Sequence, residues 1–534
     1  MLGAFGPVLT AQPTLEGTVM DAMRHSGIAG VSVRLVSSNN DSQETTTDEA
    51  GRFSFSSLPA SSYTVVLGKE GYVPADSSDE FGGRLPVIRP SATERVNFEM
   101  LQLSQLRGRV LHADGTPAAG VQLLLEQARF GQQMAVSGAD GAYVFDVRPG
   151  SYYVLASPKA ASPGKSRTTE AATYFPEASD FSQAQAIIVG AGSAVSGLDV
   201  HLRSISLYRL SGVVVNDSGA REKATVEVRK TIPSGSAVWP LTSRGGTPGA
   251  GQTILIYSPP DSTGTGDPYA TATSDDGHFT FAVPEGEWSI HASAEIPGDR
   301  QLAADVAVVV PSEDQESLQI PLERTFDLKV EVEVEGGTES RWMVPPLMLR
   351  PADAGRPPVA GYDDSILNLI HADEGRPQKS MRFDHVQAGS YRVVQSAEAV
   401  LTGLYLAGFS VGEQNVMDRA FSVSANRTDL RAVFRRARGG LRGRTDEGKP
   451  ATVLVIPESD SATDAILCVD SSKASPFSIP VLAPGNYTVV AVDKMDALRL
   501  SDASVRAALV TLGTRVTIDD TMLTLQMAVH AWPE

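Results

Sequence analysis

Residues 140–154 read Asp-Gly-Ala-Tyr-Val-Phe-Asp-Val-Arg-Pro-Gly-Ser-Tyr-Tyr-Val, and this stretch decides the fold. Its Asp-Gly pair suits a tight turn, because an Asp side chain accepts hydrogen bonds from amides two residues on and Gly tolerates a positive φ. Tyr143 and Phe145 stand two residues apart, so a β-strand places both rings on one face. A Pro-Gly corner follows, after which we expect Tyr152 to open a second strand. The stretch therefore predicts two antiparallel strands that share one aromatic core.

The same pattern returns five times along the chain. Its landmarks are Asp48, Gly51, Phe53, Phe55, Pro59 and Tyr63 in the first copy; Asp140, Gly141, Tyr143, Phe145, Pro149, Gly150 and Tyr152 in the second; Asp276, Gly277, Phe279, Phe281, Pro284, Gly286 and Trp288 in the third; Phe383, Gly389 and Tyr391 in the fourth; and Phe477, Ile479, Pro484, Gly485 and Tyr487 in the fifth. The last two copies lack the Asp-Gly turn. We expect the Tyr or Trp after each corner to anchor a buried core.

A Gly-x-Val motif opens most repeats and gives their length. It stands at Gly17, Gly108 and Gly212, with a weaker copy at Gly443. The first intervals are roughly 100 residues, which suits one β-sandwich each, and the last is about twice as long. The sequence therefore predicts an all-β fold, a tandem array of five immunoglobulin-like or transthyretin-like β-sandwich domains. The predicted boundaries are 1–14 for a leader or truncated signal segment, 15–102, 103–204, 205–325 with a long insertion, 326–436 with degenerate motifs, and 437–534.

The composition opposes two classes of partner. The 534 residues are 42% hydrophobic and carry a net charge of -18. Phosphate backbones and anionic membranes repel an acidic chain, so we expect no nucleic-acid partner. Seven arginines crowd into residues 427–444; polyanion binding is one interpretation, and a solvated edge strand that docks on an acidic neighbour is the favoured one. No apolar stretch is long enough for a transmembrane segment.

A search for chemistry finds no complete motif. The eight histidines form no i, i+4 pair, and the single Cys468 lies in an apolar run that predicts a buried, inert thiol. Residues 246–253 imitate a phosphate loop, but Gln252 stands where Lys is required. Residues 261–267 space oxygen ligands like a calcium loop and lack the distal Glu. We therefore predict no enzyme activity, no catalytic residues, no cofactor and no metal site.

Aromatic residues outside the repeated pattern are the candidate binding residues. Trp239, Tyr257, Tyr269, Trp342 and Tyr362 lie in this group, several of them in long insertions of the third and fourth units. Because exposed flat rings can stack on sugar faces, they are candidate carbohydrate contacts. Ordinary packing of long loops onto a sandwich is the alternative interpretation.

The combination of Gly-x-Val, Ala-Gly-Val-x-Val, Asp-x-Gly-x-Phe-x-Phe and Pro-Gly-x-Tyr resembles the carboxypeptidase regulatory-like domain family. This family has a transthyretin-like sandwich related to Cna-B-type surface modules, and the present series is similar to acidobacterial-type tandem arrays. The resemblance implies a non-catalytic module of exported or surface proteins. Cna-B relatives often form a Lys-Asn isopeptide bond, but Thr18 and Arg109 occupy the corresponding first-strand positions, so we expect no such bond.

These observations favour a non-enzymatic, exported multi-domain protein that acts as a structural or interaction array at the cell envelope. We expect a periplasmic, outer-membrane-associated or secreted location, with an envelope protein or a polysaccharide as partner. The alternatives are a carbohydrate-binding protein and an accessory fragment of a larger enzyme or receptor. Residues 2–11 are apolar but short and lack a basic start, so they are interpreted either as a truncated export signal or as a frayed terminus.

Overall fold

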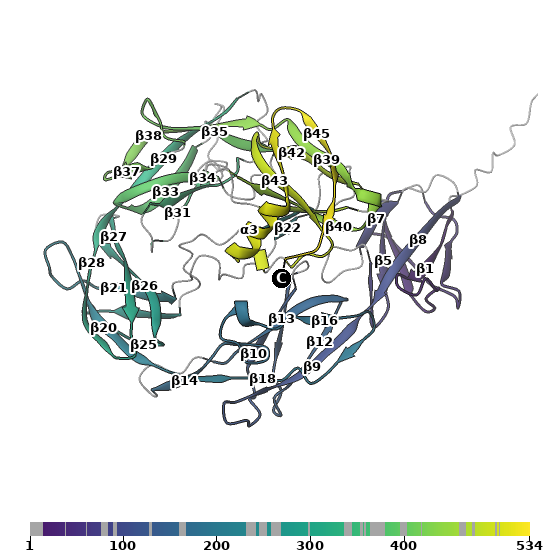
Figure 1. The fold of residues 1–534 in the computed structure, drawn as a ribbon, viewed down its shortest axis with the longest axis horizontal. Coiled ribbons are helices and arrows are strands. Elements are labelled where there is room, and N and C mark those ends of the chain that lie inside the picture. The colour runs from purple at the N-terminus through teal and green to yellow at the C-terminus, as the bar shows by residue number, and fades with distance from the viewer. Residues whose placement is uncertain are drawn as a thin grey trace, which may run out of the picture. The chain divides into compact units, whose positions relative to one another are not determined.

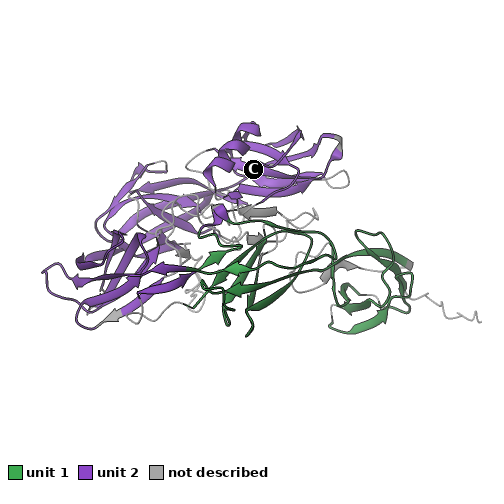
Figure 2. Ribbon diagram, turned by 60° about the horizontal axis from the view of Figure 1, so that its bottom comes forward, with its two compact units in different colours: residues 1–159, 172–179, 184–203 green, residues 160–171, 180–183, 204–534 purple. Residues whose placement is uncertain are grey.

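The computed structural model consists almost entirely of β-strands, with a single α-helix among the residues it describes (Figure 1). Those residues are 14–37, 39–59, 61–75, 84–88, 93–127, 131–159, 167–230, 242–244, 254–257, 269–296, 300–335, 344–352, 356, 359–363, 380–395, 403–417, 419–458, 466–471, 476–496, 499–500 and 502–533. They form two compact units, green and purple in Figure 2: residues 1–159, 172–179 and 184–203 make up unit 1, and residues 160–171, 180–183 and 204–534 make up unit 2.

Five core clusters of buried apolar side chains lie in the described part of the chain, within residues 15–100, 106–202, 210–322, 328–434 and 441–527. Two sheets enclose each cluster, and each such pair of sheets is called a sandwich, numbered 1 to 5 in chain order. The predicted all-β sandwich fold is confirmed. The division into five separate domains at the predicted boundaries stays a prediction.

Unit 1 contains sandwiches 1 and 2. Sandwich 1 pairs its strands as β4-β1-β8-β6 and β3-β2-β5-β7, and sandwich 2 as β12-β9-β17, with β18 on β9, and β11-β10-β13-β15, with β16 on β13. The strands of sandwich 1 are β1 (Thr14–Asp21), β2 (Ser32–Ser37), β3 (Ser42–Thr46), β4 (Arg52–Phe55), β5 (Tyr63–Gly68), β6 (Tyr72–Pro74), β7 (Arg84–Ile88) and β8 (Thr93–Gln102). Those of sandwich 2 are β9 (Ser104–Leu111), β10 (Gln122–Gln127), β11 (Gly131–Val136), β12 (Ala142–Val147), β13 (Gly150–Ser157), β15 (Thr173–Tyr174), β16 (Ile187–Val189), β17 (Ala194–Val195) and β18 (Val200–His201).

Unit 2 contains sandwiches 3 and 4, which share one ten-stranded sheet. Sandwich 3 and its insertion consist of β20 (Tyr208–Val215), β21 (Ala224–Lys230), β22 (Thr242–Arg244), β23 (Ile254–Tyr257), β24 (Ala270–Ser274), β25 (His278–Val283), β26 (Gly286–Ile296), β27 (Arg300–Val310) and β28 (Gln315–Pro321). Sandwich 4 consists of β29 (Glu323–Glu335), β30 (Leu347–Pro351), β31 (Val359–Ala360), β32 (Tyr362–Asp363), β33 (Ser380–Gln387), β34 (Gly389–Gln395), β35 (Leu404–Val411), β36 (Gln414–Asn415), β37 (Phe421–Val423) and β38 (Arg427–Arg436). The short β14 (Thr168–Ala171), η1 (Phe181–Gln183) and β19 (Arg203–Ser206) precede them in the chain.

Sandwich 5 completes unit 2, with a three-stranded sheet β42-β39-β45 and a larger sheet β22-β23-β41-β40-β43-β44. Its elements are β39 (Gly439–Thr445), η2 (Asp446–Gly448), β40 (Ala451–Pro457), β41 (Ile466–Ser471), β42 (Phe477–Leu482), β43 (Gly485–Val492), α3 (Ala503–Leu512), β44 (Thr514–Ile518), β45 (Met522–Met527) and β46 (Val529–His530). The larger sheet therefore includes two strands, β22 and β23, that come from the insertion of sandwich 3.

The closing strand of each repeat explains the glycine of the Gly-x-Val motif. In sandwich 1, β8 runs parallel to β1, and a β-carbon on Gly17 would overlap the carbonyl oxygen of Val96. The same overlap would occur at Gly108 with Leu198, at Gly212 with Leu318 and at Gly443 with Leu525. The glycine therefore allows the closing strand to lie directly against the opening strand.

The aromatic residue after the corner is bonded in the same way in all five sandwiches. Its side chain donates to the carbonyl oxygen four residues earlier: Tyr63 to Pro59 (2.7 Å), Tyr152 to Arg148 (2.7 Å), Trp288 to Pro284 (3.0 Å), Tyr391 to Gln387 (3.0 Å) and Tyr487 to Ala483 (2.9 Å). All five side chains are buried, and burial raises the pKa of Tyr487 to about 12. The predicted core anchors are confirmed.

The Asp-Gly turns are also built as predicted. The Asp48 carboxylate accepts hydrogen bonds from the amides of Ala50 (2.9 Å) and Arg52 (2.7 Å). In the two later turns the carboxylate accepts from the amide two residues on, at 3.1 Å in both: Asp140 from Ala142 and Asp276 from His278. A turn-capping role therefore accounts for the recurrence of these carboxylates.

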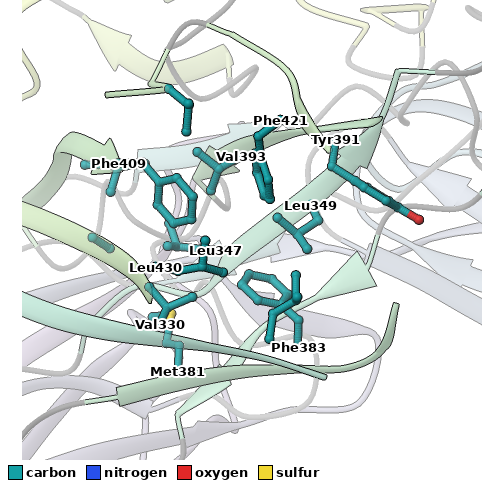
Figure 3. Packing of buried hydrophobic residues seen from close by; sticks show 14 of the residues in the cluster. Val330, Leu347, Leu349, Met381, Phe383, Tyr391, Val393, Phe409, Phe421 and Leu430 are labelled. Carbon is teal, nitrogen blue, oxygen red and sulfur yellow. The ribbon is translucent and has the colours of Figure 1, made fainter. Parts of the chain in front are cut away.

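Sandwich 4 has a well-packed core although its motifs are degenerate. Figure 3 shows Phe409, Phe421 and Val393 pointing toward one another from three strands, and the rings of Phe409 and Phe421 lie 5.8 Å apart. Phe383 and Tyr391 are also buried in this cluster. The loss of the Asp-Gly turn therefore left the aromatic core in place.

The helix α3 is the clearest departure from the predicted all-β fold. Asp502 caps it by accepting a hydrogen bond from the amide of Ser504 (2.8 Å). The helix buries Val505 and Leu509 and packs near β43 (Figure 1). With only two buried positions in ten residues, the helical periodicity of apolar residues is weak, and for this reason the helix was not predicted from the sequence.

Candidate interaction surfaces

Tyr269 is the candidate sugar-binding residue whose side chain the structure describes. It lies just before β24, is 39% exposed, and packs edge-on against Trp288 with ring centroids 4.9 Å apart. Burial of the rest of the ring raises the pKa of its hydroxyl. Tyr269 therefore presents a partly exposed ring that a buried core residue supports.

Two further candidates lie on strands that pair in other sandwiches. Tyr257 is the last residue of β23 and pairs with Ile466 in the larger sheet of sandwich 5, whereas Tyr362 lies in β32 of sandwich 4. Trp239 and Trp342 lie outside the described residues. Carbohydrate contact by these residues therefore stays a prediction.

A row of polar side chains crosses the outer face of sandwich 3. Glu227, His291 and Asp305 are cross-strand neighbours on β21, β26 and β27. His291 Nδ1 lies 2.9 Å from Asp305 Oδ1, while Arg229 forms an ion pair with Glu227 at 2.6 Å. A histidine beside a carboxylate is an acid-base pair of the kind that enzymes use.

The surroundings of this row favour a connecting role. The second oxygen of Asp305 accepts a hydrogen bond from the Nε2 atom of Gln387, which lies on β33 of sandwich 4. Nearby, β27 pairs with β29 through Leu302 and Ala303, and this pairing continues one sheet from sandwich 3 into sandwich 4. The polar row therefore ties two sandwiches together at the point where their sheet is shared.

Two arginines of the arginine-rich segment form ion pairs with glutamates of the neighbouring strand β29. Arg431 forms an ion pair with Glu333, and Arg435 with Glu335 at 2.6 Å. The Arg435 guanidinium holds the pKa of the Glu335 carboxyl below its usual value. The predicted docking on an acidic neighbour is confirmed. The expected edge strand is wrong, because β38 lies between β29 and β35.

The described residues carry little further chemistry. Within them, no group of three or more His, Cys, Asp or Glu side chains is placed to hold a metal ion. No helix in the same ranges is long and apolar enough to cross a membrane. Cys468 is buried, as predicted. At the first-strand position where Cna-B relatives often have Lys, the Thr18 hydroxyl donates to Asn97 Oδ1 at 2.8 Å.

The surface that sequence reasoning missed is an edge of sandwich 5. Four residues of β23 pair antiparallel with β41, from Ile254 opposite Val469 to Tyr257 opposite Ile466. The sequence predicts a long insertion in the third unit, but no sequence signal indicates which sheet a strand of that insertion joins. The pairing is a case of strand addition between two sandwiches of one chain.

Comparisons with known proteins agree with the fold of the first repeat. Residues 14–100 match the family model of the carboxypeptidase regulatory-like domain, which confirms the predicted resemblance there. No curated protein matches the chain.

Among solved structures, the minor pilin GBS52 of Streptococcus agalactiae is 13% identical, with 36% of this chain and 97% of that one covered and a TM-score of 0.22. A streptococcal ancillary pilin is 10% identical, with 58% and 99% covered and a TM-score of 0.22. The Bacillus anthracis TIE protein is 12% identical over 59% of this chain and 51% of that one, with a TM-score of 0.17. Likenesses of this size carry no argument about function. The family match covers the first sandwich, and residues 14–100 are thus similar to the carboxypeptidase regulatory-like domain.

Proposed function

We propose that the protein is a non-enzymatic, exported array of five carboxypeptidase regulatory-like sandwiches that serves as a structural and interaction element at the cell envelope. The five buried clusters and the corner bond that recurs in every sandwich support five domains at the boundaries given above. The family match at residues 14–100 supports a non-catalytic module.

One observation carries the structural role: backbone pairing joins the sandwiches of unit 2. Leu302 and Ala303 of sandwich 3 pair with Arg324 and Glu323 of sandwich 4, and β23 pairs with β41 of sandwich 5. Sheets that continue from one sandwich into the next restrict hinge motion between them. A stiff series of small sandwiches is suited to spacing or presenting surfaces, and it supplies edges and loops where partners bind.

The experiment that tests the envelope role is fractionation of the source cells, combined with protease treatment of intact cells and detection by antibody. We expect the protein in the envelope or medium fraction, with fragments after external protease if it is exposed at the surface. A cytosolic enzyme is the control for lysis. Recovery of all the protein in the cytosol with that control would contradict export.

A carbohydrate-binding role is the second candidate, and the half-exposed ring of Tyr269 favours it. Glycan-array and polysaccharide co-sedimentation assays on the full chain would test it. Trp239→Ala, Tyr257→Ala, Tyr269→Ala and Trp342→Ala are the variants, and Tyr72→Ala in sandwich 1 is the matched control. Binding that is lost in one of the four and kept in the control would support this role. No binding to any glycan would remove it.

A further inference from the structure

The strand β41 is buried on both of its faces, so the surface that it offers to another strand is an edge. Leu467 and Val469 belong to the core of sandwich 5, and Ile466 and Cys468 on the opposite face are each 1% exposed. On one side β41 pairs with β40 through residues 467–471. Recognition at the other side therefore depends on backbone hydrogen bonds.

The occupant of this edge comes from a distant part of the sequence. β23 reads Ile-Leu-Ile-Tyr, without charge, and pairs with residues 466–469. In the sequence, β23 lies in the connection between β21 and β24. These two strands pair with each other, so the sheet of sandwich 3 is continuous without β23. An apolar edge strand left open is prone to pairing with other chains, and β23 covers this one.

The described pairing of β23 with the edge is short, four residue pairs. Beyond β41 its described partner is β22, through three residue pairs, and a two-stranded hairpin has little stability of its own. The strand β41 continues beyond these four described pairs through Asp470 and Ser471, and Asp470 is exposed. A strand with a basic residue ahead of its apolar run would place opposite charges across the pair at Asp470.

We propose that the outer edge of β41 is a strand-acceptor site for a partner protein that offers an extended, uncharged apolar segment preceded by a basic residue, with β23 as its resident occupant. The partner displaces β23 and adds its own strand to the larger sheet of sandwich 5. The inference deepens the proposed interaction role and rests on it for the external partner. The acceptor itself rests on the observed pairing.

The single cysteine allows a direct test of the resident pairing. Leu255 lies opposite Cys468, and directly opposed residues of antiparallel strands are close enough for a disulfide. The full chain carrying Leu255→Cys is oxidised mildly and analysed by non-reducing electrophoresis and peptide mapping. We expect an intrachain bond between positions 255 and 468, and free thiols in the control Ile256→Cys, which lies opposite Leu467.

Equal crosslinking in both variants, or none in either, would overturn the pairing. A disulfide-linked dimer would contradict pairing of β41 with β23 of the same chain, and would show that β23 of a second copy occupies the edge.

The acceptor is then tested with a fluorescent peptide of residues 251–260 in which Lys replaces Thr253, the residue that precedes the apolar run. Its target is the chain in which Asn-Gly replaces residues 231–268, and circular dichroism checks that this chain folds. We expect anisotropy to show binding at least about tenfold tighter than to the parent chain, and a similar loss when Leu255→Pro is placed in the peptide. Binding that is equal for both chains or both peptides, or absent from the folded variant, would overturn the proposal.

A second comparison does not depend on the deletion. The oxidised and reduced forms of the Leu255→Cys chain differ in whether β23 can leave the edge. We expect peptide binding to weaken at least about tenfold on oxidation, and equal binding would overturn the displaceable occupant. These outcomes are independent of where the protein resides, so a failed acceptor and a failed envelope role are distinguishable.

Discussion

The corresponding sheets of sandwiches 2 and 5 have equivalent central strands, but different elements adjoin them. In sandwich 2, Leu124 of β10 lies between Met134 and Leu155, and in sandwich 5, Leu454 of β40 lies between Cys468 and Val490. Both rows face away from the core of their sandwich. Met134 is 79% exposed and Cys468 is 1% exposed.

The difference arises from the elements that adjoin each sheet. Sandwich 5 has α3 beside β43, and its edge strand β41 receives β23. In sandwich 2 the corresponding edge strand β11 ends the sheet, and Leu124 and Leu155 are half-buried, although Tyr153 in the next row is buried. One sandwich pattern therefore supports both an open sheet face and a covered one. The apolar row acquires a structural role only where other elements cover it.

The largest expected effect separates the two central leucines. Leu454→Ala should lower the local free energy of unfolding of sandwich 5 by about 2 to 5 kcal/mol, because it leaves a cavity at a fully buried site. Leu124→Ala should cost under about 1 kcal/mol in sandwich 2, because its side chain is already partly in water. Hydrogen exchange of β40 and β10, followed by mass spectrometry, measures both. Equal losses would show that the two rows are covered to the same degree.

The next pair exchanges the outermost residues of the rows for the same polar group. Cys468→Ser should destabilise sandwich 5 by about 1 to 3 kcal/mol, because a hydroxyl is placed in an apolar, buried site. Met134→Ser should change the stability of sandwich 2 by less than about 0.5 kcal/mol, because position 134 is exposed. The same exchange measurement on β41 and β11 checks the pair. A larger loss at Met134 would mean that a partner covers the open face in solution.

The sequence was informative where a local rule decides the structure. The turn carboxylate of Asp140, the paired rings of Tyr143 and Phe145, and the corner bond of Tyr152 each depend on neighbours within a few residues, so spacing alone predicts them. The glycine at Gly108 also has a local signature, although its cause is the distant closing strand.

The covering of sandwich 5 could not be predicted in the same way. The apolar run of β23 indicates a strand, but its partner β41 lies about two hundred residues later, and register between such segments depends on the whole fold. The helix α3 had one usable signal, an Asp at position 502 ahead of a run rich in Ala and Leu. The candidate sugar contacts depend on loop conformation, which composition does not determine.

The helix α3, which lies beside the larger sheet of sandwich 5, can be destabilised without a substitution in the rows centred on Leu124 and Leu454. Asp502→Ala removes the cap of α3 and should cost about 1 kcal/mol, since the Ser504 amide loses its acceptor. Hydrogen bonds from the hydroxyl and the amide of Ser504 lower the pKa of Asp502, so this contribution is present above the ordinary value of 3.8 and is lost as pH falls through the depressed pKa. Exchange protection of β43 should fall in the variant, while the corresponding strand β13 of sandwich 2 stays unchanged. If the exchange protection of β43 is unchanged in Asp502→Ala, α3 does not contribute to covering this face of the sheet.

The smallest effect concerns the feature that the two sandwiches share. Tyr152→Phe and Tyr487→Phe each remove one hydroxyl bond to the backbone, and each should cost about 0.5 to 1.5 kcal/mol. Burial raises the pKa of Tyr487 from 10.0 to about 12, so its hydroxyl stabilises the fold fully below pH 10.0. That contribution is lost as pH rises toward 12, because the unfolded chain ionises first. Exchange protection of β43 should therefore fall over this window in the parent and fall less in Tyr487→Phe. If the exchange protection of β43 falls equally in the parent and in Tyr487→Phe, a group other than Tyr487 causes the alkaline sensitivity. The corner bonds of the two sandwiches would then share their geometry without this dependence on pH.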